Sequence, residues 1–284
     1  MSGQRGGYTV NSWYLLVDSL PFAWAHFPFM QNALLAILLV SPLFALIGTL
    51  VISNHMAFFS DAIGHATLTG IAIGAILGLS DPTWAMMGFC VLLALAVTIL
   101  RRYSKVSADT LIGLVMAFAV ALGVVLLSRN GGFAKYSVFL IGDLLTITTA
   151  EIERLAIILL LVGGLWVAYF NRFVFTFLNR SLAQSRGVNI WAMEAFFACI
   201  VALVVAVSIP WVGLLVVNSL LIIPAATSRN LASNSRQYVL IAFCLSLVSG
   251  TFGLVLSYYW GSAAGATVVL VAMVLYAVSL FLRR

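Results

Sequence analysis

The feature that most constrains the fold of this chain is a series of apolar runs, each roughly 18 residues or longer and free of Asp, Glu, Lys and Arg, that recurs along its length. Runs of that length are typical of helices that cross a lipid bilayer. Hydrophobic residues make up 63% of the 284 residues and charged residues 8%, against about 25% charged in soluble domains. The sequence therefore predicts an all-α, polytopic helical membrane protein and excludes a water-soluble fold.

Nine candidate crossings can be placed, each close to the roughly 20 residues that span hydrocarbon. They are roughly residues 30–52, 60–79, 83–102, 110–128, 152–172, 190–209, 212–228, 238–259 and 265–282. The run 212–228 follows Pro210 and contains Asn218 and Pro224, so it is either a full crossing or a broken, re-entrant element. The sequence thus predicts eight or nine transmembrane helices.

The basic residues indicate the orientation, because cytoplasmic loops carry an excess of Lys and Arg. With alternating crossings, most of the 14 Lys and Arg residues fall on the face that holds residues 101–105, 172–189 and the C-terminus. This face is predicted to be cytoplasmic, with the N-terminus outside. The basic residues are dispersed and do not accompany aromatic stacking residues, so we expect no nucleic-acid partner.

The first 29 residues are predicted to lie at the membrane surface. Apolar residues, among them Trp13, Val17 and Trp24, recur there at helical spacing, which is typical of an interfacial helix. A short apolar core followed by a small-residue cleavage site is missing, which argues against a cleaved signal peptide. We therefore expect an N-terminal interfacial segment, 1–29, followed by one transmembrane domain, 30–284.

Asp61 and His65 are the strongest candidates for a functional site, because ionisable groups inside a spanning segment are costly, at about 2.5–3.5 kcal/mol each for charged residues, and are functional by default. Four residues apart on a helix, both side chains emerge from one face. A carboxylate and an imidazole so placed suit a first-row divalent cation such as zinc. The alternative is a hydrogen-bonded pair that only orients two helices.

Several catalytic signatures do not occur in the sequence. It has no G-x-x-x-x-G-K-[ST] phosphate loop, and it has neither H-E-x-x-H nor G-x-S-x-G. The chain is therefore not expected to be an enzyme, and it cannot hydrolyse ATP through a phosphate loop. Asp143 lies in a predicted outer segment too short to span, where it either lines a vestibule or caps a short helix.

Four stretches of the chain resemble the membrane permeases of bacterial ABC importers for zinc, manganese and iron. They are S-D-A-I-G-H-A-T-L-T-G at 60–70, D-T-L-I-G-L-V-M-A-F-A-V-A-L-G at 109–123, F-L-I-G-D-L-L-T-I-T at 139–148 and V-G-L-L-V-V-N-S-L-L-I-I-P-A-A-T-S-R at 212–229. The resemblance runs from about residue 30 to residue 282. It implies a permease in the bacterial cytoplasmic (inner) membrane that moves a divalent metal inward and holds no permanent cofactor.

The resemblance also implies partners and site residues. The expected partners are two copies of an ATP-binding subunit, an extracytoplasmic metal-binding protein and a second copy of this chain. Asp61 and His65 match the positions of the family's pathway aspartate and histidine. The segment N-R-S-L-A-Q-S-R-G-V at 179–188 is similar to the family's cytoplasmic contact with the ATPase, where Ala183, Arg186 and Gly187 are the candidate coupling residues. Asn179 departs from the aspartate common there.

Zinc is preferred over manganese because G-D-L-L at 142–145 looks more like the zinc-uptake permeases, although Asp with His is also acceptable to manganese or iron(II). Two alternative functions remain at this stage. One is a related permease for siderophores or cobalamin, against which Asp61 and His65 on one helix argue. The other is an ion-gradient-driven transporter, which usually shows inverted repeats with paired broken helices.

Overall fold

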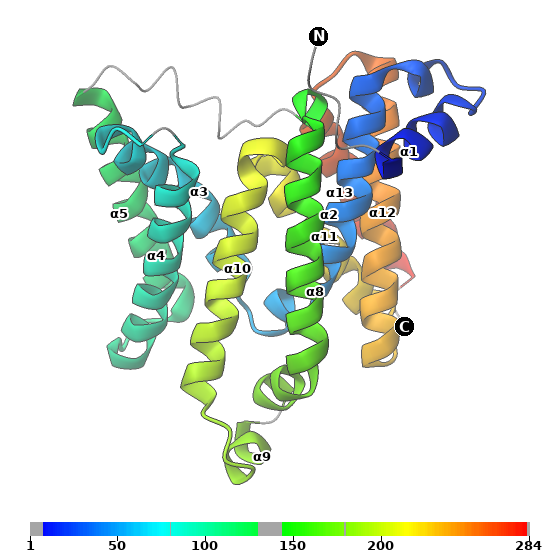
Figure 1. Cartoon of the computed structure of the whole chain (residues 1–284). Coiled ribbons are helices and arrows are strands. Elements are labelled where there is room, and N and C mark those ends of the chain that lie inside the picture. The colour runs from blue at the N-terminus through cyan, green and yellow to red at the C-terminus, as the bar shows by residue number, and fades with distance from the viewer. Residues whose placement is uncertain (1–7, 80, 130–143, 179, 283–284) are drawn as a thin grey trace.

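The computed structural model describes residues 8–79, 81–129, 144–178 and 180–282, and every regular element in these ranges is helical (Figure 1). In hydrocarbon the backbone N–H and C=O groups must be satisfied within the protein, and a helix satisfies them within one segment. The prediction of an all-α fold is confirmed.

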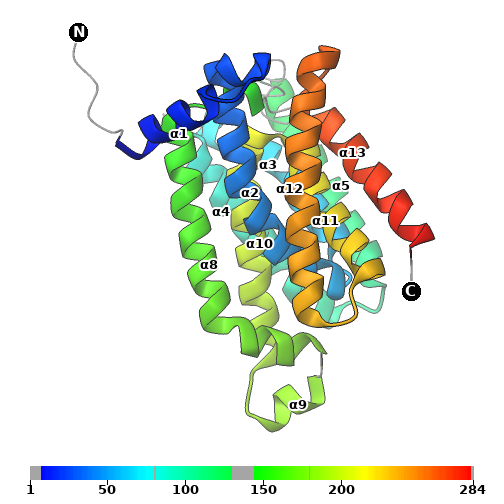
Figure 2. The same ribbon diagram turned by 90° about the vertical axis from the view of Figure 1, so that its right-hand side faces the viewer.

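In this part of the chain, nine helices of at least 18 residues form one bundle (Figures 1 and 2). They are α2 (Pro28–Ser53), α3 (Ala57–Ile76), α4 (Thr83–Tyr103), α5 (Ala108–Arg129), α8 (Thr149–Leu178), α10 (Ile190–Val212), α11 (Leu214–Leu231), α12 (Ser235–Trp260) and α13 (Ala264–Phe281). Eight of them are long and apolar enough to cross a membrane. The other, α8, has 30 residues and packs against α2 and α10. The predicted count of eight or nine spans agrees with this bundle.

The doubtful run 212–228 corresponds to α11, which is continuous through Pro224. The chain breaks just before it, at Gly213, whose φ of 85° is a conformation that side-chain-bearing residues rarely adopt. Pro210 lies within the last turn of α10. Of the two alternatives for this run, a crossing or a broken, re-entrant element, the structure has a continuous helix. A sharp connection at Gly213 joins it to α10.

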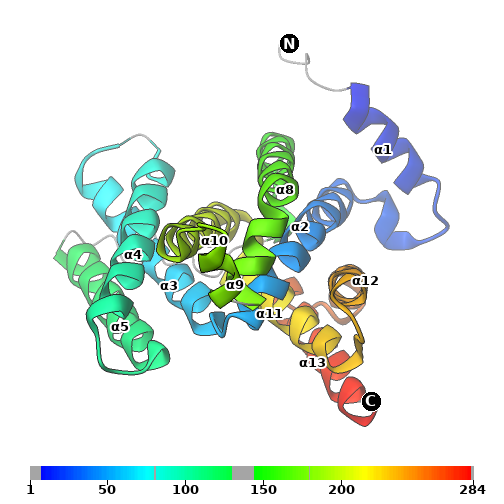
Figure 3. The ribbon, with the colours of Figure 1, turned by 90° about the horizontal axis from the view of Figure 1, so that it is seen from below.

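The shorter helices lie at opposite ends of the bundle: α1 (Tyr8–Asp18) at one end and α9 (Arg180–Ser185) at the other (Figure 1). The former extends away from the bundle and is attached to α2 by two hydrogen bonds (Figure 3). Trp13 Nε1 donates to the Gln31 carbonyl at 3.2 Å, and the Tyr14 hydroxyl donates to Asn32 Oδ1 at 2.6 Å. Single-turn helices cover Ala23–His26 and Leu144–Thr146.

Small residues fix α3 between α4 and α5. A Cβ on Gly70 would lie 2.5 Å from the Met86 Cα atom of α4, and a Cβ on Gly123 of α5 would lie 2.5 Å from Thr69 Oγ1. The Thr69 hydroxyl also donates to the Ala119 carbonyl of α5. Close backbone approach of this kind is how helices associate in a membrane.

Gly70, Gly74 and Gly78 follow one another at four-residue intervals, a spacing that predicts one packing face, but Gly78 does not belong to it. The helix ends at Ile76, and Gly78 adopts a φ of 68° with open space around it. Its N–H bonds to the Ala75 carbonyl and the N–H of Leu79 bonds to Gly74, which is the Schellman arrangement at a helix end. Gly78 therefore caps the helix, while Gly70 and Gly74 contact α4.

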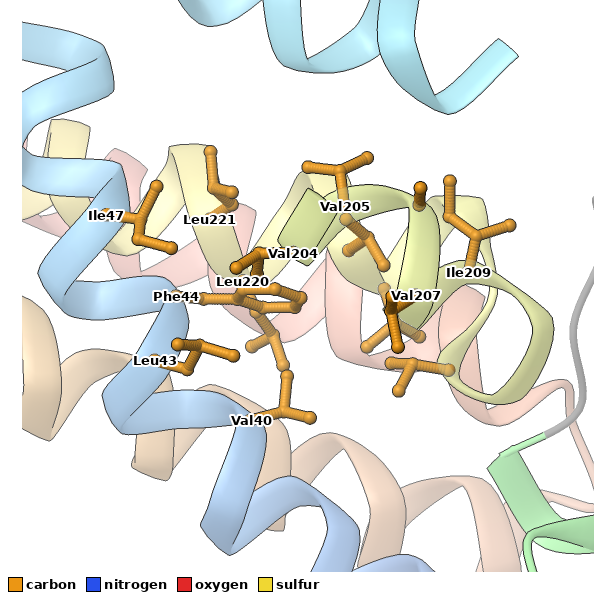
Figure 4. Packing of buried hydrophobic residues seen from close by; sticks show 14 of the residues in the cluster. Val40, Leu43, Phe44, Ile47, Val204, Val205, Val207, Ile209, Leu220 and Leu221 are labelled. Carbon is orange, nitrogen blue, oxygen red and sulfur yellow. The ribbon is translucent and has the colours of Figure 1, made fainter. Parts of the chain in front are cut away.

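The core lies where α2, α10 and α11 meet (Figure 4). Phe44 of α2 is completely buried and points toward Leu220 of α11, with Val204 of α10 close by. In a bilayer the driving force for this contact is close packing, since lipid is as apolar as these side chains. This packing holds α11 against α2.

Candidate functional site

The candidate site begins at the tight turn that joins α2 to α3. His55 occupies this turn with a φ of 53°, a conformation uncommon for residues other than glycine. The N–H of Met56 bonds to the Val51 carbonyl at 2.9 Å and that of His55 to Ile52 at 3.2 Å, which closes α2 as a Schellman cap. The turn starts α3 at Ala57, so that Asp61 falls in its second turn.

Asp61 and His65 lie together on one face of α3, as their spacing predicts. His65 Nε2 is 3.7 Å from Asp61 Oδ1, and the two side chains are 38% and 34% exposed. The distance is too long for a direct hydrogen bond. It is close to the roughly 3.4 Å between two ligand atoms of a tetrahedral zinc ion with bonds of about 2.1 Å. The pair is thus spaced to accept an ion between its two atoms.

The structure adds a residue that sequence reasoning missed. Asn218, in the second turn of α11, donates from Nδ2 to Asp61 Oδ1 at 2.6 Å. Its Oδ1 atom is buried and has no hydrogen-bond partner among the described residues. In the sequence, Asn218 stands out only as a polar interruption of an apolar run. A polar residue in a spanning helix is itself a signal, but its partner is 157 residues away.

Two glycines bring Asn218 to Asp61. Gly213 makes the connection after which α11 begins, and Gly64 of α3 faces the Leu214 side chain so closely that a Cβ there would collide with it. Because Gly64 lies between Asp61 and His65 in the sequence, α11 approaches α3 at the level of the candidate ligands. The contact thus depends on the absence of a side chain at Gly64 of α3 and on the sharp connection at Gly213, just before α11.

The site is accessible on one side of the single chain. Phe58 of α3 and Leu215 of α11 are exposed beside it. Seen from below, α5 and α13 lie on either side of α3 and α11 (Figure 3). No group of three or more His, Cys, Asp or Glu side chains gathers in the described ranges, so one chain offers this carboxylate and this imidazole together with the Asn218 amide.

The candidate coupling residues lie around α9, at the end of the bundle opposite to α1 (Figure 1). Within the segment 179–188 the structure has a short helix, Arg180–Ser185. Ala183 is buried, Arg186 and Gly187 are exposed, and Gly187 has a φ of 73°. The N–H of Val188 bonds to Ala183 and that of Gly187 to Gln184, so Gly187 is the left-handed residue of a third Schellman cap.

A pocket of about 430 Å³ opens beside this cap, between α8 and the start of α10. Arg186 and Arg172 line it together with Asn189, and the Arg172 guanidinium lies 5.7 Å from the centre of the Tyr169 ring. The structure does not bring this region together with Asp61 and His65. Asp143, the possible vestibule residue, lies outside the described residues.

The sequence matches the ABC 3 transport family over residues 26–283. It is 34% identical over 260 residues to the high-affinity zinc uptake system membrane protein ZnuB of Haemophilus influenzae, covering 91% of this chain and 99% of that protein. It is 31% identical over 252 residues to the manganese transport system membrane protein MntC of Listeria innocua, covering 87% and 88%.

Solved structures are also similar. PsaBC from Streptococcus pneumoniae in complex with Fab matches with a TM-score of 0.80 and 25% identity, covering 91% of this chain and 93% of that one. An inward-facing, putative metal-chelate type ABC transporter matches with a TM-score of 0.63 and 17% identity, a likeness in fold alone.

Proposed function

The chain belongs to the ABC 3 transport family, and from this premise we propose that it is the membrane-spanning permease subunit of an ATP-driven importer that carries a divalent metal ion, zinc in the first place, into the cytoplasm. The observation that carries the proposal is the pair of side chains on α3, whose nearest N and O atoms are 3.7 Å apart. That spacing fits two ligands of one ion better than it fits a hydrogen bond.

Transport requires a site that releases its ion, and this site suits transit. A closed structural zinc site has four protein ligands. Asp61 supplies the charge that offsets the loss of the ion's water, and His65 supplies the softer imidazole. A second copy of the chain would bring the same residues to the pathway, and the exposed Phe58 and Leu215 beside the site fit such a contact.

Zinc is proposed before manganese on two grounds. The relative from Haemophilus influenzae is a zinc uptake protein, whereas that from Listeria innocua transports manganese at slightly lower identity. An imidazole ligand suits zinc, but a carboxylate with an imidazole also accepts manganese or iron(II). Manganese import is therefore the second candidate function.

The energy is proposed to come from a separate ATP-binding subunit in two copies, since this sequence has no phosphate loop. The α9 segment, with Ala183, Arg186 and Gly187, is the proposed contact with that subunit. An extracytoplasmic metal-binding protein would deliver the ion at the opposite end. The name of the similar structure PsaBC, which joins the letters B and C, fits an assembly of more than one kind of chain.

The bundle is proposed to lie in the bacterial cytoplasmic (inner) membrane, with α9 on the cytoplasmic side and α1 outside. The N-terminal segment 1–29 would lie at the outer interface and residues 30–284 would form the transmembrane domain. Exposed Leu15 and Leu16 on α1 fit contact with lipid. Impermeant amine reagents should then label Lys105 only in inside-out vesicles, and its labelling in intact cells contradicts this orientation.

The proposed site is tested by uptake of radioactive zinc and manganese in cells that depend on the transporter. Asp61→Asn removes the charge and His65→Ala removes the imidazole, and each should abolish uptake of both ions at matched membrane expression. His65→Asp should spare manganese more than zinc, because carboxylates suit the harder ion. Asp109→Asn, on exposed Asp109 at the start of α5, is the matched control. Near-normal uptake by the Asn and Ala variants would leave the pair as a structural contact.

A further inference from the structure

The amide of Asn218 is held in its orientation from one end only. Nδ2 donates to Asp61 Oδ1 at 2.6 Å, while the buried Oδ1 has no partner among the described residues. A buried acceptor without a partner is rare and calls for an explanation. The single hydrogen bond to Asp61 therefore sets which end of the amide faces the carboxylate.

Two side chains converge on one carboxylate oxygen of Asp61. Asp61 Oδ1 is 2.6 Å from Asn218 Nδ2 and 3.7 Å from His65 Nε2. An ion placed between Asp61 and His65 would lie beside the Asn218 amide as well. In the present orientation the NH₂ group, whose hydrogens are positively polarised, would face the cation, which is unfavourable. The amide oxygen, by contrast, is a ligand that divalent metals accept.

We propose, resting on the function proposed above, that Asn218 is a third ligand of the transported ion, and that its amide turns from donating to Asp61 to placing Oδ1 on the ion. Turned in place, the amide oxygen would lie where the nitrogen lies now, 2.6 Å from Asp61 Oδ1. Two oxygens that close repel each other unless a cation lies beside both. Two ligand oxygens of a tetrahedral zinc ion lie about 3.4 Å apart, so the Asp61 and Asn218 oxygens would have to move apart by less than about 1 Å.

The turn has a consequence for transit. Before the ion arrives, the amide stabilises the Asp61 carboxylate, and the ion must displace that hydrogen bond in order to bind. As the ion leaves, the amide returns to the carboxylate. The same residue thus completes the coordination and competes with it, which keeps affinity moderate. It also makes the ion a link between α3 and α11, two helices that meet at Gly64 and Leu214.

The test separates a ligand from a hydrogen-bond donor. Asn218→Leu has similar size and neither function, whereas Asn218→Asp keeps an oxygen ligand and loses the donor. Zinc affinity of the purified full chain in lipid nanodiscs is measured by competition with a zinc-binding dye. We expect the Leu variant to lose about tenfold or more, the range found for lost partners of metal sites. The Asp variant should bind at least as tightly as the parent, and in the importer it should release zinc and transport it more slowly.

Asn230→Leu is the matched control on the same helix, because Asn230 donates to the Ser279 hydroxyl away from the site; its zinc affinity should not change. The thermal unfolding midpoint of each variant distinguishes a loss of zinc binding from a loss of folding. If the Leu variant fails to fold, Asn218→Thr replaces it, because threonine is smaller and keeps an oxygen. Unchanged zinc affinity in the Leu variant, or an equal loss of zinc affinity in the Leu and Asp variants, would contradict the proposal that Asn218 is a third ligand. If Asp61→Asn and His65→Ala bind zinc normally, the proposed site itself is wrong.

Discussion

The helix α3 and the helix α9 differ in what determines their structure. The former packs against α4, α5, α10 and α11, and most of its residues are buried. The latter has six residues and packs against α8 and α10 beyond the end of the bundle. Their glycines differ in the same way. Gly70 is required by space, because the Met86 backbone lies against it, whereas Gly187 is surrounded by open space and is required by its φ of 73°.

This difference separates two kinds of functional requirement. The proposed ligands Asp61 and His65 would need a backbone held in place, and the close packing of α3 provides that rigidity. The proposed contact with an ATP-binding subunit would need only a local shape, which the cap at Gly187 helps to maintain. Changes at the closely packed positions of α3 should therefore affect folding, and changes in α9 should affect coupling while the bundle stays folded.

The largest effect is expected for Gly70→Val. The added carbon atoms must displace the Met86 backbone, and such overpacking costs about 3 kcal/mol or more where the neighbour is main chain. The yield of monodisperse protein in detergent and its thermal unfolding midpoint should both fall sharply. Gly88→Val on α4, at an exposed glycine with nothing within 4 Å, is the control and should behave like the parent. Equal behaviour of the two variants would remove the distinction made for α3.

A smaller effect on folding, but a strong one on coupling, is expected for Gly187→Val. A β-branched residue at positive φ is strained by about 1–3 kcal/mol, which should open the cap at the end of α9. Metal-dependent ATPase activity of the reconstituted complex should fall while the unfolding midpoint of the bundle stays near that of the parent. Gly187→Asn, which tolerates the left-handed conformation, should retain most coupling. A large drop in the unfolding midpoint instead would mean that α9 belongs to the rigid part.

Arg186→Glu should have a lesser effect, because it reverses a charge without straining the backbone. We expect a severalfold loss of ATPase stimulation, roughly what 1 kcal/mol produces, since exposed ion pairs contribute about 0–1 kcal/mol. Arg236→Glu, on an exposed residue at the start of α12, controls for charge on the same side of the bundle. Unchanged coupling in both the Arg186 and Gly187 variants would remove this segment from the mechanism.

The sequence predicts the helices well, because hydrocarbon leaves the backbone few alternatives. The predicted crossing 30–52 corresponds to α2 (Pro28–Ser53), and the predicted crossing 212–228 corresponds to α11 (Leu214–Leu231). The shared face of Asp61 and His65 followed from helical geometry alone. Helix positions and the spacing of residues within one helix depend on neighbouring residues only, so they can be predicted from a single sequence.

What the sequence did not predict depends on how helices meet. The Asn218 hydrogen bond joins residues 157 positions apart, and it depends on the close approach of α11 to Gly64. Gly78 fits the four-residue spacing of the packing glycines, yet the helix ends before it. Spacing cannot distinguish a glycine that makes room from one that ends a helix, because both appear as the same letter.

The smallest effect is expected at His55, where the two kinds of requirement meet, since this turn has the cap geometry of Gly187 and leads directly into α3. His55→Gly should relieve the cost of a φ of 53°, about 1–2 kcal/mol, against a loss of about 0.5–1 kcal/mol from the greater freedom of glycine in the unfolded chain. The net gain is then about 0–1.5 kcal/mol, a rise of a few degrees at most in the thermal unfolding midpoint. Metal uptake should be unchanged, because His55 contributes its backbone conformation to the turn and is not one of the proposed ligands. His55→Val, strained at the same φ, should shift the midpoint the other way. A loss of uptake in the Gly variant with a normal unfolding midpoint would show that the His55 ring acts in transport, and would extend the site beyond α3 and α11.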